Sequence, residues 1–473
     1  MAALSHSPAD RLDWYLEAKF GLFLHWGAYA AGGVEASWPI MTPDMAEIMF
    51  GNSTRISEAD YTALPRRFNP RAFDARAWVR LAQEAGMRYI VLTAKHHDGF
   101  CMFDAPGTDY KITNTSYGKD ICLVLAEACA EAGMRLGFYY SPPDMHDPGY
   151  RDTKKPVTAN WLGEPKRAAW SAYLDTMESQ LRKLLTAYGE VSILWFDGLV
   201  NHQKYDPPRF HRLIHELSPN TLINDRLGDD YDFITPEQFI SKIGVPVRTG
   251  KPPAGNEGGE GLFRAVPVML KVPVLGGWLR NQLTKYAAGD LDLSKIPQAP
   301  NPEPRDFQPW ETCMTMGGSW AYNPAETEWK PAQRLVMNLV EVVSKGGNFL
   351  LNVGPMGDGN FPAQAVERLK YIGQWMKRNA DAIYGTTYAP PMPGFTGKVT
   401  QKGGTYYLNV FDWPAEDRIV IRYFPMVIRS VSLLSGEPLV YRHEDGRLEI
   451  HLTAQAPDTP VTVIAVRTEG PLA

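Results

Sequence analysis

Short apolar runs alternate with amphipathic segments over most of the chain. Residues 193–197 are a continuous apolar run that ends in an aspartate, as expected for the end of a strand that is buried on both faces. In the segment 73–86 the apolar residues instead recur at i, i+3, i+4 and i+7, which predicts a helix. EAGMRY at 84–89 and EAGMRL at 131–136 are near repeats of a helix end that leads into a strand. This alternation predicts repeated β–α units and a parallel sheet.

The number of strand-like segments indicates the kind of sheet. Six helices are expected, at 73–86, 119–133, 168–188, 207–217, 331–344 and 362–379. Eight strand segments are expected, at 21–27, 88–100 with its exit loop, 135–144, 191–197, 221–225, 232–235, 310–315 and 347–354. The sixth has the weakest pattern. Eight strands of this kind predict an α/β fold, a (β/α)8-like TIM barrel.

Two regions depart from this rhythm. Residues 244–305 are rich in Gly and Pro, and an insertion over the barrel mouth, a partner-binding tract and a partly disordered segment all remain open for them. From about residue 386 onward, short alternating segments separated by turn residues predict an antiparallel β-sandwich. We therefore expect a catalytic domain at 1–384 and a β-sandwich domain at 385–473.

Composition excludes several function classes. The chain has 473 residues, and its 48 basic and 53 acidic side chains give a net charge of −5 without basic runs, so neither nucleic acid nor an anionic membrane is an expected partner. No window of about 20 uncharged apolar residues predicts a membrane span. The four cysteines form no CxxC pair, and no signal peptide is visible, so a cytoplasmic protein is expected. A periplasmic or secreted location would require a leader outside the given sequence, and a homo-oligomer remains open.

Polar residues follow several of the predicted strands. In a parallel barrel, such residues converge on the face where these enzymes keep their active sites. They are His25, Trp26, His96, His97, Asp98, Tyr139, Tyr140, Asp197, Asn224, Asp225, Arg226, Glu237, Glu311 and Asn352. As neighbours on a strand, His96 and His97 would point in opposite directions and could not share one ion without a kink in the loop. HxH and HExxH motifs are absent, so no catalytic metal and no cofactor are expected.

Two carboxylates among aromatic and neutral polar side chains fit glycoside hydrolysis. One carboxylate must be ionised near the anomeric carbon, and the other must be protonated near the leaving oxygen. Asp197, at the end of a rigid strand, is our expected nucleophile. Glu237, just after the sixth expected strand, is our first choice of acid/base. Histidines and Tyr139 would hold sugar hydroxyls.

Several longer motifs carry a family resemblance. They are KFGLFLHWGAY (19–29), AGMRYIVLTAKHHDGFCMFD (85–104), AGMRLGFYYSPPD (132–144), ILWFDG (193–198), NDR (224–226), WETCMTMGGSWAYN (310–323) and GGNFLLNVGPMGDG (346–359). In order and spacing the chain resembles glycoside hydrolase family 29, the retaining α-L-fucosidases, over residues 10–385. The resemblance implies a metal-free barrel with a C-terminal β-sandwich that cleaves terminal α-L-fucose from fucosylated oligosaccharides or glycoconjugates.

The resemblance also implies roles for individual residues. Asp197 matches the family nucleophile. The residues that match its fucose contacts are His25, His96, His97, Tyr139 and Arg226, and Trp320 is expected to line the site. The family's acid/base is poorly fixed in sequence: Glu237 fits best, Glu311 is next, and Glu257 and Glu260 are further alternatives.

The chain departs from the family pattern after the first strand. The family usually has a Glu-Trp pair there that contacts the sugar, whereas this chain has Ser37 directly before Trp38. Either Glu35 takes over that contact through a shifted loop, or the contact is lost.

Three functions follow from these observations. The first is a retaining α-L-fucosidase with an Asp nucleophile and a Glu acid/base. The second is a glycosidase for a related sugar, an α-L-galactoside, because an apolar wall rejects one added hydroxyl only modestly. The third is a non-catalytic sugar-binding protein of the same fold.

Overall fold

The computed structural model describes residues 10–41, 55–151, 167–198, 205–238, 240, 307–389 and 392–470. The expected insertion at 244–305, together with Glu257 and Glu260, lies outside the described residues.

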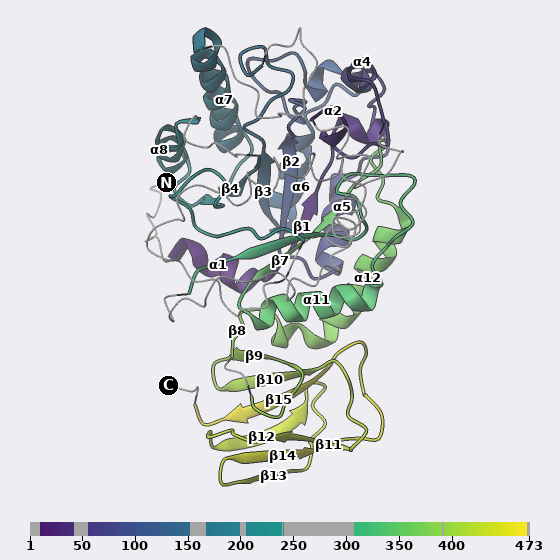
Figure 1. Ribbon diagram of the computed structural model, residues 1–473, viewed down its shortest axis with the longest axis vertical. Helices are drawn as coiled ribbons and strands as arrows, with labels where there is room; N and C mark the ends of the chain where they lie inside the picture. Colours follow the sequence, from purple (N-terminus) through teal and green to yellow (C-terminus); the bar gives the residue numbers. More distant parts are fainter. Residues whose placement is uncertain are drawn as a thin grey trace, which may run out of the picture.

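A parallel seven-stranded sheet forms the larger part of the fold (Figure 1). Its strand order is β5-β4-β3-β2-β1-β7-β6. The strands are β1 (Phe20–Leu24), β2 (Tyr89–Lys95), β3 (Arg135–Tyr140), β4 (Val191–Phe196), β5 (Leu222–Ile223), β6 (Glu311–Thr315) and β7 (Asn348–Val353). Nearly all of their residues are buried, which explains why the sequence shows apolar runs rather than strict alternation.

The sixth expected strand occupies the gap between the two edges of this sheet. Phe233 pairs in parallel with Asn224, just after β5, and Ile234 pairs in parallel with Trp310, just before β6. Glu237 pairs with Cys313 in the same direction. The segment 233–237 therefore joins β5 to β6 through isolated bridges, and it completes the predicted (β/α)8-like barrel.

Helices flank the strands in the predicted order. They are α1 (Asp10–Ala18), α2 (Trp38–Met41), α4 (Glu58–Thr62), α5 (Ala75–Glu84), α6 (Ile121–Ala132), α7 (Arg167–Ala187), α8 (Pro207–Leu217), α11 (Ala332–Ser344) and α12 (Ala363–Asn379). Local chemistry fixes two of the starts: the side chains of Asp74 and Asp120 accept hydrogen bonds from the backbone N–H groups of Ala77 and Leu123. None of the helices in the described part of the chain is long and apolar enough to cross a membrane.

The C-terminal region consists of two antiparallel sheets. The larger has the order β12-β15-β10-β9-β8 and the smaller the order β11-β14-β13. The strands are β8 (Thr387–Tyr388), β9 (Lys398–Lys402), β10 (Thr405–Val410), β11 (Arg418–Ile421), β12 (Ile428–Leu433), β13 (Tyr441–Glu444), β14 (Arg447–His451) and β15 (Thr462–Thr468). Side chains from both sheets share one core, so the predicted β-sandwich is confirmed.

The larger sheet also packs on the barrel. Tyr406 and Leu408 of β10 point into the sandwich core, whereas Tyr407 between them belongs to the barrel core. This is the two-residue alternation of a strand with two covered faces. Helices α11 and α12 lie between the barrel and the sandwich (Figure 1), and the Trp375 indole N–H of α12 donates to the Val461 carbonyl at 3.0 Å.

Candidate active site

Asp197 lies directly after β4, where the buried strand gives way to solvent. Its side chain is 21% exposed, whereas every residue of β4 is buried. The next residue must be glycine for two reasons: Gly198 has φ +77°, and a Cβ atom there would lie 2.6 Å from Cε1 of His97. The Phe-Asp-Gly sequence thus ends the strand and lets His97 approach the carboxylate.

Three side chains surround the Asp197 carboxylate. The Tyr139 hydroxyl donates to Oδ2 at 2.8 Å, and Nη1 of Arg226 donates to Oδ1. Nε2 of His97 lies 3.6 Å from Oδ2. Burial raises the pKa of Asp197, but Arg226, His97 and Tyr139 more than offset that effect and hold the pKa below its ordinary 3.8. Asp197 is therefore an ionised carboxylate at neutral pH.

Arg226 joins this carboxylate to a second one. Its Nη2 donates to Oε2 of Glu237 at 3.1 Å, and its Nε donates to the Thr235 hydroxyl at 3.2 Å. The guanidinium also lies 4.7 Å from the centre of the Trp195 ring. Burial and the nearby Asp197 charge raise the pKa of Glu237 above its ordinary 4.5, although Arg226 opposes the shift. The two carboxyl groups therefore share one cation, and their pKa values are shifted in opposite directions.

The three predicted histidines lie together at the same face. Burial lowers the pKa of His25 and of His97 to about 4, and it places that of His96 well below its ordinary 6.5, so all three are neutral at pH 7. Nδ1 of His25 lies 2.7 Å from the Asn352 amide oxygen, and Nδ1 of His97 lies 2.5 Å from the Ser141 hydroxyl. Neutral imidazoles can donate to or accept from sugar hydroxyls.

His96 and His97 do not point in opposite directions, as neighbours on a strand would. Their ring centres lie 4.3 Å apart, and each ring contacts Tyr139. The reason is that β2 ends at Lys95, so both histidines belong to the exit loop and not to the pleated strand.

Aromatic rings form the wall beside these histidines. The Tyr139 ring is stacked on His96 on one side (5.3 Å between ring centres) and on Trp195 on the other (5.7 Å). Trp320 contacts the His25 ring at 4.9 Å. The predicted residues therefore come together on one polar and aromatic surface, as recognition of a sugar ring requires.

The Glu35 side chain is already engaged in the protein interior and does not take over the sugar contact of the family's glutamate. It is fully buried, and its carboxyl group accepts hydrogen bonds from the backbone N–H groups of Trp320, at 2.6 Å, and Ala321, at 3.1 Å. Burial raises its pKa to about 8. Glu35 therefore positions the Trp320 loop, while the hydroxyl of Ser37 contacts Nδ1 of His96.

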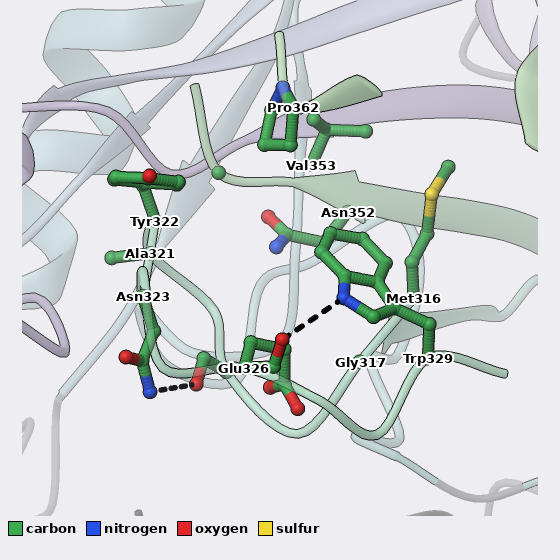
Figure 2. Close-up of a pocket in the computed structure, with 12 residues that line it drawn as sticks. Met316, Gly317, Ala321, Tyr322, Asn323, Glu326, Trp329, Asn352, Val353 and Pro362 are labelled. Atoms are coloured by element: carbon green, nitrogen blue, oxygen red, sulfur yellow. Dashed lines mark hydrogen bonds between the residues drawn. The ribbon is translucent and has the colours of Figure 1, made fainter. Parts of the chain in front are cut away.

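The Trp320 loop is held from its far side as well. Figure 2 shows the residues around a neighbouring cavity of about 20 Å³, which has room for a single water molecule and not for a sugar. The Glu326 carboxylate accepts from the Gly318 N–H at 2.7 Å, and the Trp329 indole donates to the Glu326 carbonyl at 3.3 Å. The Asn352 amide donates to the Trp320 carbonyl at 2.7 Å, which couples this loop to His25.

Two further candidates lie away from the carboxylate pair. Glu311 is fully buried inside the barrel, where the Trp195 indole and the Tyr89 hydroxyl donate to its carboxyl group. Trp38 begins α2 and is partly buried against the barrel core. Because Glu311 has no solvent access, Glu237 is the acid/base candidate that the geometry favours among the described glutamates.

Sequence reasoning did not assign roles to the residues that orient the histidines. Ser37, Ser141 and Asn352 each contact a histidine ring nitrogen, and Thr235 holds Arg226. The sequence did indicate Asn352 as a site residue, because it lies near the C-terminal end of β7, as the other candidates lie near the C-terminal ends of their strands. For Ser141 there was no such signal, since a hydroxyl in a loop is most often a turn residue.

A scan against protein-family models matches residues 4–244 and 277–381 to alpha-L-fucosidase. The chain is 27% identical to an alpha-L-fucosidase of Dictyostelium discoideum over 79% of this chain and 71% of that protein. It is 25% identical to the human plasma alpha-L-fucosidase over 90% of this chain and 82% of that protein.

Solved structures agree with these matches. The alpha-L-fucosidase isoenzyme 1 from Paenibacillus thiaminolyticus superposes with a TM-score of 0.77 at 31% identity, over 98% of this chain and 99% of that one. A family 29 alpha-L-fucosidase from Bacteroides thetaiotaomicron, trapped as a covalent intermediate with 2-fluoro-fucosyl fluoride, shares the fold with a TM-score of 0.71 at 23% identity, over 99% of this chain and 97% of that one. From its motifs, its fold and these relatives, the chain belongs to the alpha-L-fucosidase family, glycoside hydrolase family 29.

Proposed function

We propose that this enzyme releases terminal α-L-fucose from fucosylated glycans with Asp197 as nucleophile and Glu237 as acid/base. The observation that carries the proposal is the Arg226 guanidinium, which contacts both carboxyl groups. Two titratable groups with pKa values shifted apart are what an acid and a nucleophile need. Nothing in the comparisons supports the α-L-galactosidase or the non-catalytic alternative.

The reaction proceeds in two displacements. In the first, an Asp197 oxygen attacks the anomeric carbon, the glycosidic bond breaks, and protonated Glu237 gives its proton to the departing oxygen. In the second, ionised Glu237 takes a proton from water, the water oxygen attacks the anomeric carbon, and the ester bond to Asp197 breaks. Two inversions leave the configuration of the sugar unchanged.

The neighbouring groups support this sequence of steps. Tyr139 and Arg226 fix the orientation of the Asp197 carboxylate, and neutral His25, His96 and His97 present ring nitrogens to the sugar. Contact of fucose with the predicted binding residues stays a prediction: they are His25, His96, His97, Tyr139, Arg226, Trp38 and Trp320. So does a cytoplasmic location, with which four buried, unpaired cysteines are compatible.

The test is hydrolysis of 4-nitrophenyl α-L-fucoside by the wild type and by Asp197→Gly. We expect the variant to lose at least about 10³-fold in turnover, because no covalent intermediate forms. Sodium azide should restore the release of 4-nitrophenol and give β-fucosyl azide, because the small anion fits the space that the carboxylate leaves.

Asp445→Gly is the matched control. Asp445 lies at φ +49° in the exposed turn between β13 and β14, so the same substitution there should leave turnover unchanged. Full activity of Asp197→Gly without azide would refute the assignment of the nucleophile.

A further inference from the structure

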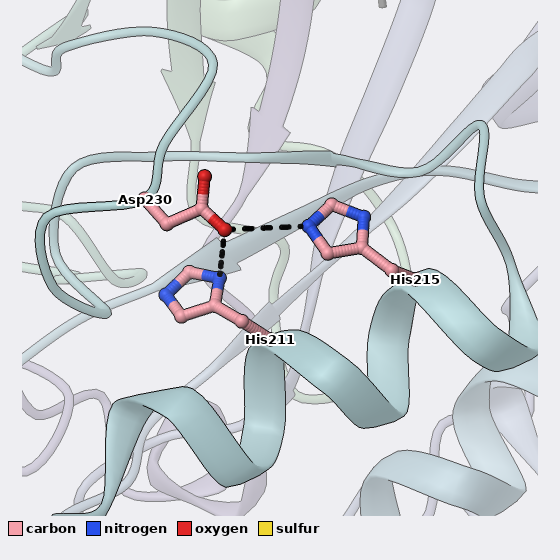
Figure 3. A group of neighbouring side chains, drawn as sticks. All are labelled: His211, His215 and Asp230. Carbon is pink, nitrogen blue, oxygen red and sulfur yellow. Dashed lines mark ion pairs between the residues drawn. The ribbon is translucent and has the colours of Figure 1, made fainter.

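A second group of polar side chains lies on the outside of the barrel. His211 and His215 are one turn apart on α8, so both rings extend from the same face of the helix. Asp230, from the segment after β5, points its carboxylate at both rings (Figure 3). Its Oδ2 lies 3.9 Å from Nδ1 of His211 and 3.6 Å from Nε2 of His215.

His211 is the unusual member of this group. The residue is only 5% exposed, and neither of its ring nitrogens has a hydrogen-bond partner within the described part of the chain. A buried polar atom without a partner destabilises the folded state, so native structures nearly always supply one. The 3.9 Å separation from Asp230 is too long for a hydrogen bond. The imidazole is thus oriented toward a position between the three side chains that a further atom can fill.

We propose that His211, His215 and Asp230 bind one divalent transition-metal ion, with zinc as the best-fitting ion. One ligand atom from each of the three side chains lies within 4.8 Å of the other two. Tetrahedral zinc with bonds of about 2.0–2.1 Å places its ligands about 3.3 Å apart, so small side-chain movements close the site. Two imidazoles favour zinc over magnesium or calcium, which prefer oxygen ligands.

The surroundings give the ion access and a further ligand. The Asp230 side chain is 72% exposed and that of His215 is 37% exposed, whereas His211 forms the inner wall. An ion can therefore enter from solvent, and water can complete the coordination at the outer side.

The site would connect α8 to the segment that carries Arg226. Asp230 lies four residues after Arg226, and the intervening Gly228 has φ +139°, where an added Cβ would lie 3.0 Å from Pro207 and 3.8 Å from Nε2 of His211. The chain thus passes close over the start of α8 before it returns to the barrel. A metal here is structural: it fixes the segment that presents Arg226 and does not touch the reacting carboxylates.

The experiment uses the full-length protein without a polyhistidine tag, freed of metal with EDTA. Equilibrium dialysis against zinc chloride, followed by elemental analysis, should give one zinc per chain, and zinc should raise the melting temperature because it binds only the folded state. Magnesium chloride should do neither. Cobalt in place of zinc should give the visible absorption of a tetrahedral site.

The variants His215→Ala and Asp230→Asn, both on partly exposed side chains, should lose the bound zinc and the rise in melting temperature. His451→Ala, which removes an exposed histidine from β14, should keep both. Far-UV circular dichroism of each variant verifies that it is folded. Absence of stoichiometric zinc in the wild type, or equal zinc in His215→Ala and Asp230→Asn, would overturn the proposal.

Discussion

The mouth and the interior of the barrel each hold carboxyl groups, and the two environments differ in solvent access and in the charge of the groups that contact these carboxyls. Asp197 and Glu237 at the mouth are 21% and 33% exposed and share a guanidinium. Glu311, inside the barrel, has no exposed surface, and the Tyr89 and Trp195 side chains that donate to its carboxyl group are uncharged. Trp195 links the regions, because its indole N–H donates to Glu311 at 3.0 Å while its ring lies beside Arg226.

The difference shows what makes a carboxyl group reactive. Burial raises the pKa of Glu311 from its ordinary 4.5 to about 7, and the hydrogen bonds from uncharged side chains oppose the shift only in part. Asp197 is also shielded, yet the adjacent Arg226 keeps it ionised. Solvent access and the charge of the partner therefore distinguish the two regions, although the residue types are similar.

The largest effect on kcat/KM is expected from replacing Glu237 and not from replacing Glu311. Glu237→Gln should lose about 10²–10⁴-fold in kcat/KM on fucosides with alkyl leaving groups, because these need a proton on the departing oxygen. The loss should be smaller on the 4-nitrophenyl fucoside, whose leaving group needs less assistance.

Glu311→Gln is the matched control, since it makes the same change in the barrel interior. Its kcat/KM should keep the wild-type ratio between the two leaving groups. A leaving-group effect in Glu311→Gln and none in Glu237→Gln would exchange the two roles.

An intermediate effect is expected for Arg226→Lys. An ammonium cannot contact both carboxyl groups in the fork geometry of a guanidinium. Loss of one charge-assisted hydrogen bond, about 1.5–3 kcal/mol, corresponds to a fall in kcat/KM of roughly 10- to 150-fold. The acidic limb of the pH–rate profile should move to higher pH as the pKa of Asp197 rises. An unchanged acidic limb would show that Arg226 does not set the charge of Asp197.

A further effect is expected from Glu311 in the interior, on the free energy of unfolding and not on the rate of catalysis. The folded protein raises the pKa of Glu311 to about 7, so between about pH 4.5 and pH 7 the folded state binds more protons than the unfolded state. The free energy of unfolding should therefore fall as pH rises through this range, by on the order of 3 kcal/mol for this group.

Denaturant unfolding of Glu311→Gln at several pH values measures that contribution. A glutamine at position 311 cannot ionise, so the free energy of unfolding of the variant should fall less steeply than that of the wild type between pH 4.5 and pH 7. Parallel curves for the two proteins would show that Glu311 does not change its protonation in this range.

Much of the fold follows from local sequence patterns. The apolar runs determined the barrel strands, and the alternating segments determined most of the C-terminal strands, because burial on two faces or on one produces these patterns directly. The short strands β8, β9 and β13 carry no clear apolar pattern, since they are two to five residues long and mostly polar. The expected domain boundary at 384/385 stays a prediction.

Polar residues that follow strands gave the candidate site, because the ends of parallel strands meet at one face of a barrel. Tertiary structure alone decided how these residues interact. The contact of Arg226 with both Asp197 and Glu237 joins β4 to the segment before β6. The hydrogen bond from the Trp320 backbone N–H to the Glu35 carboxyl group joins residues 285 positions apart in the sequence. The i, i+4 spacing of His211 and His215 was visible in the sequence, but the approach of Asp230 was not. The protonation states of these side chains and the arrangement of possible metal ligands depend on distances between residues that are far apart in the sequence. Local sequence patterns do not encode those distances.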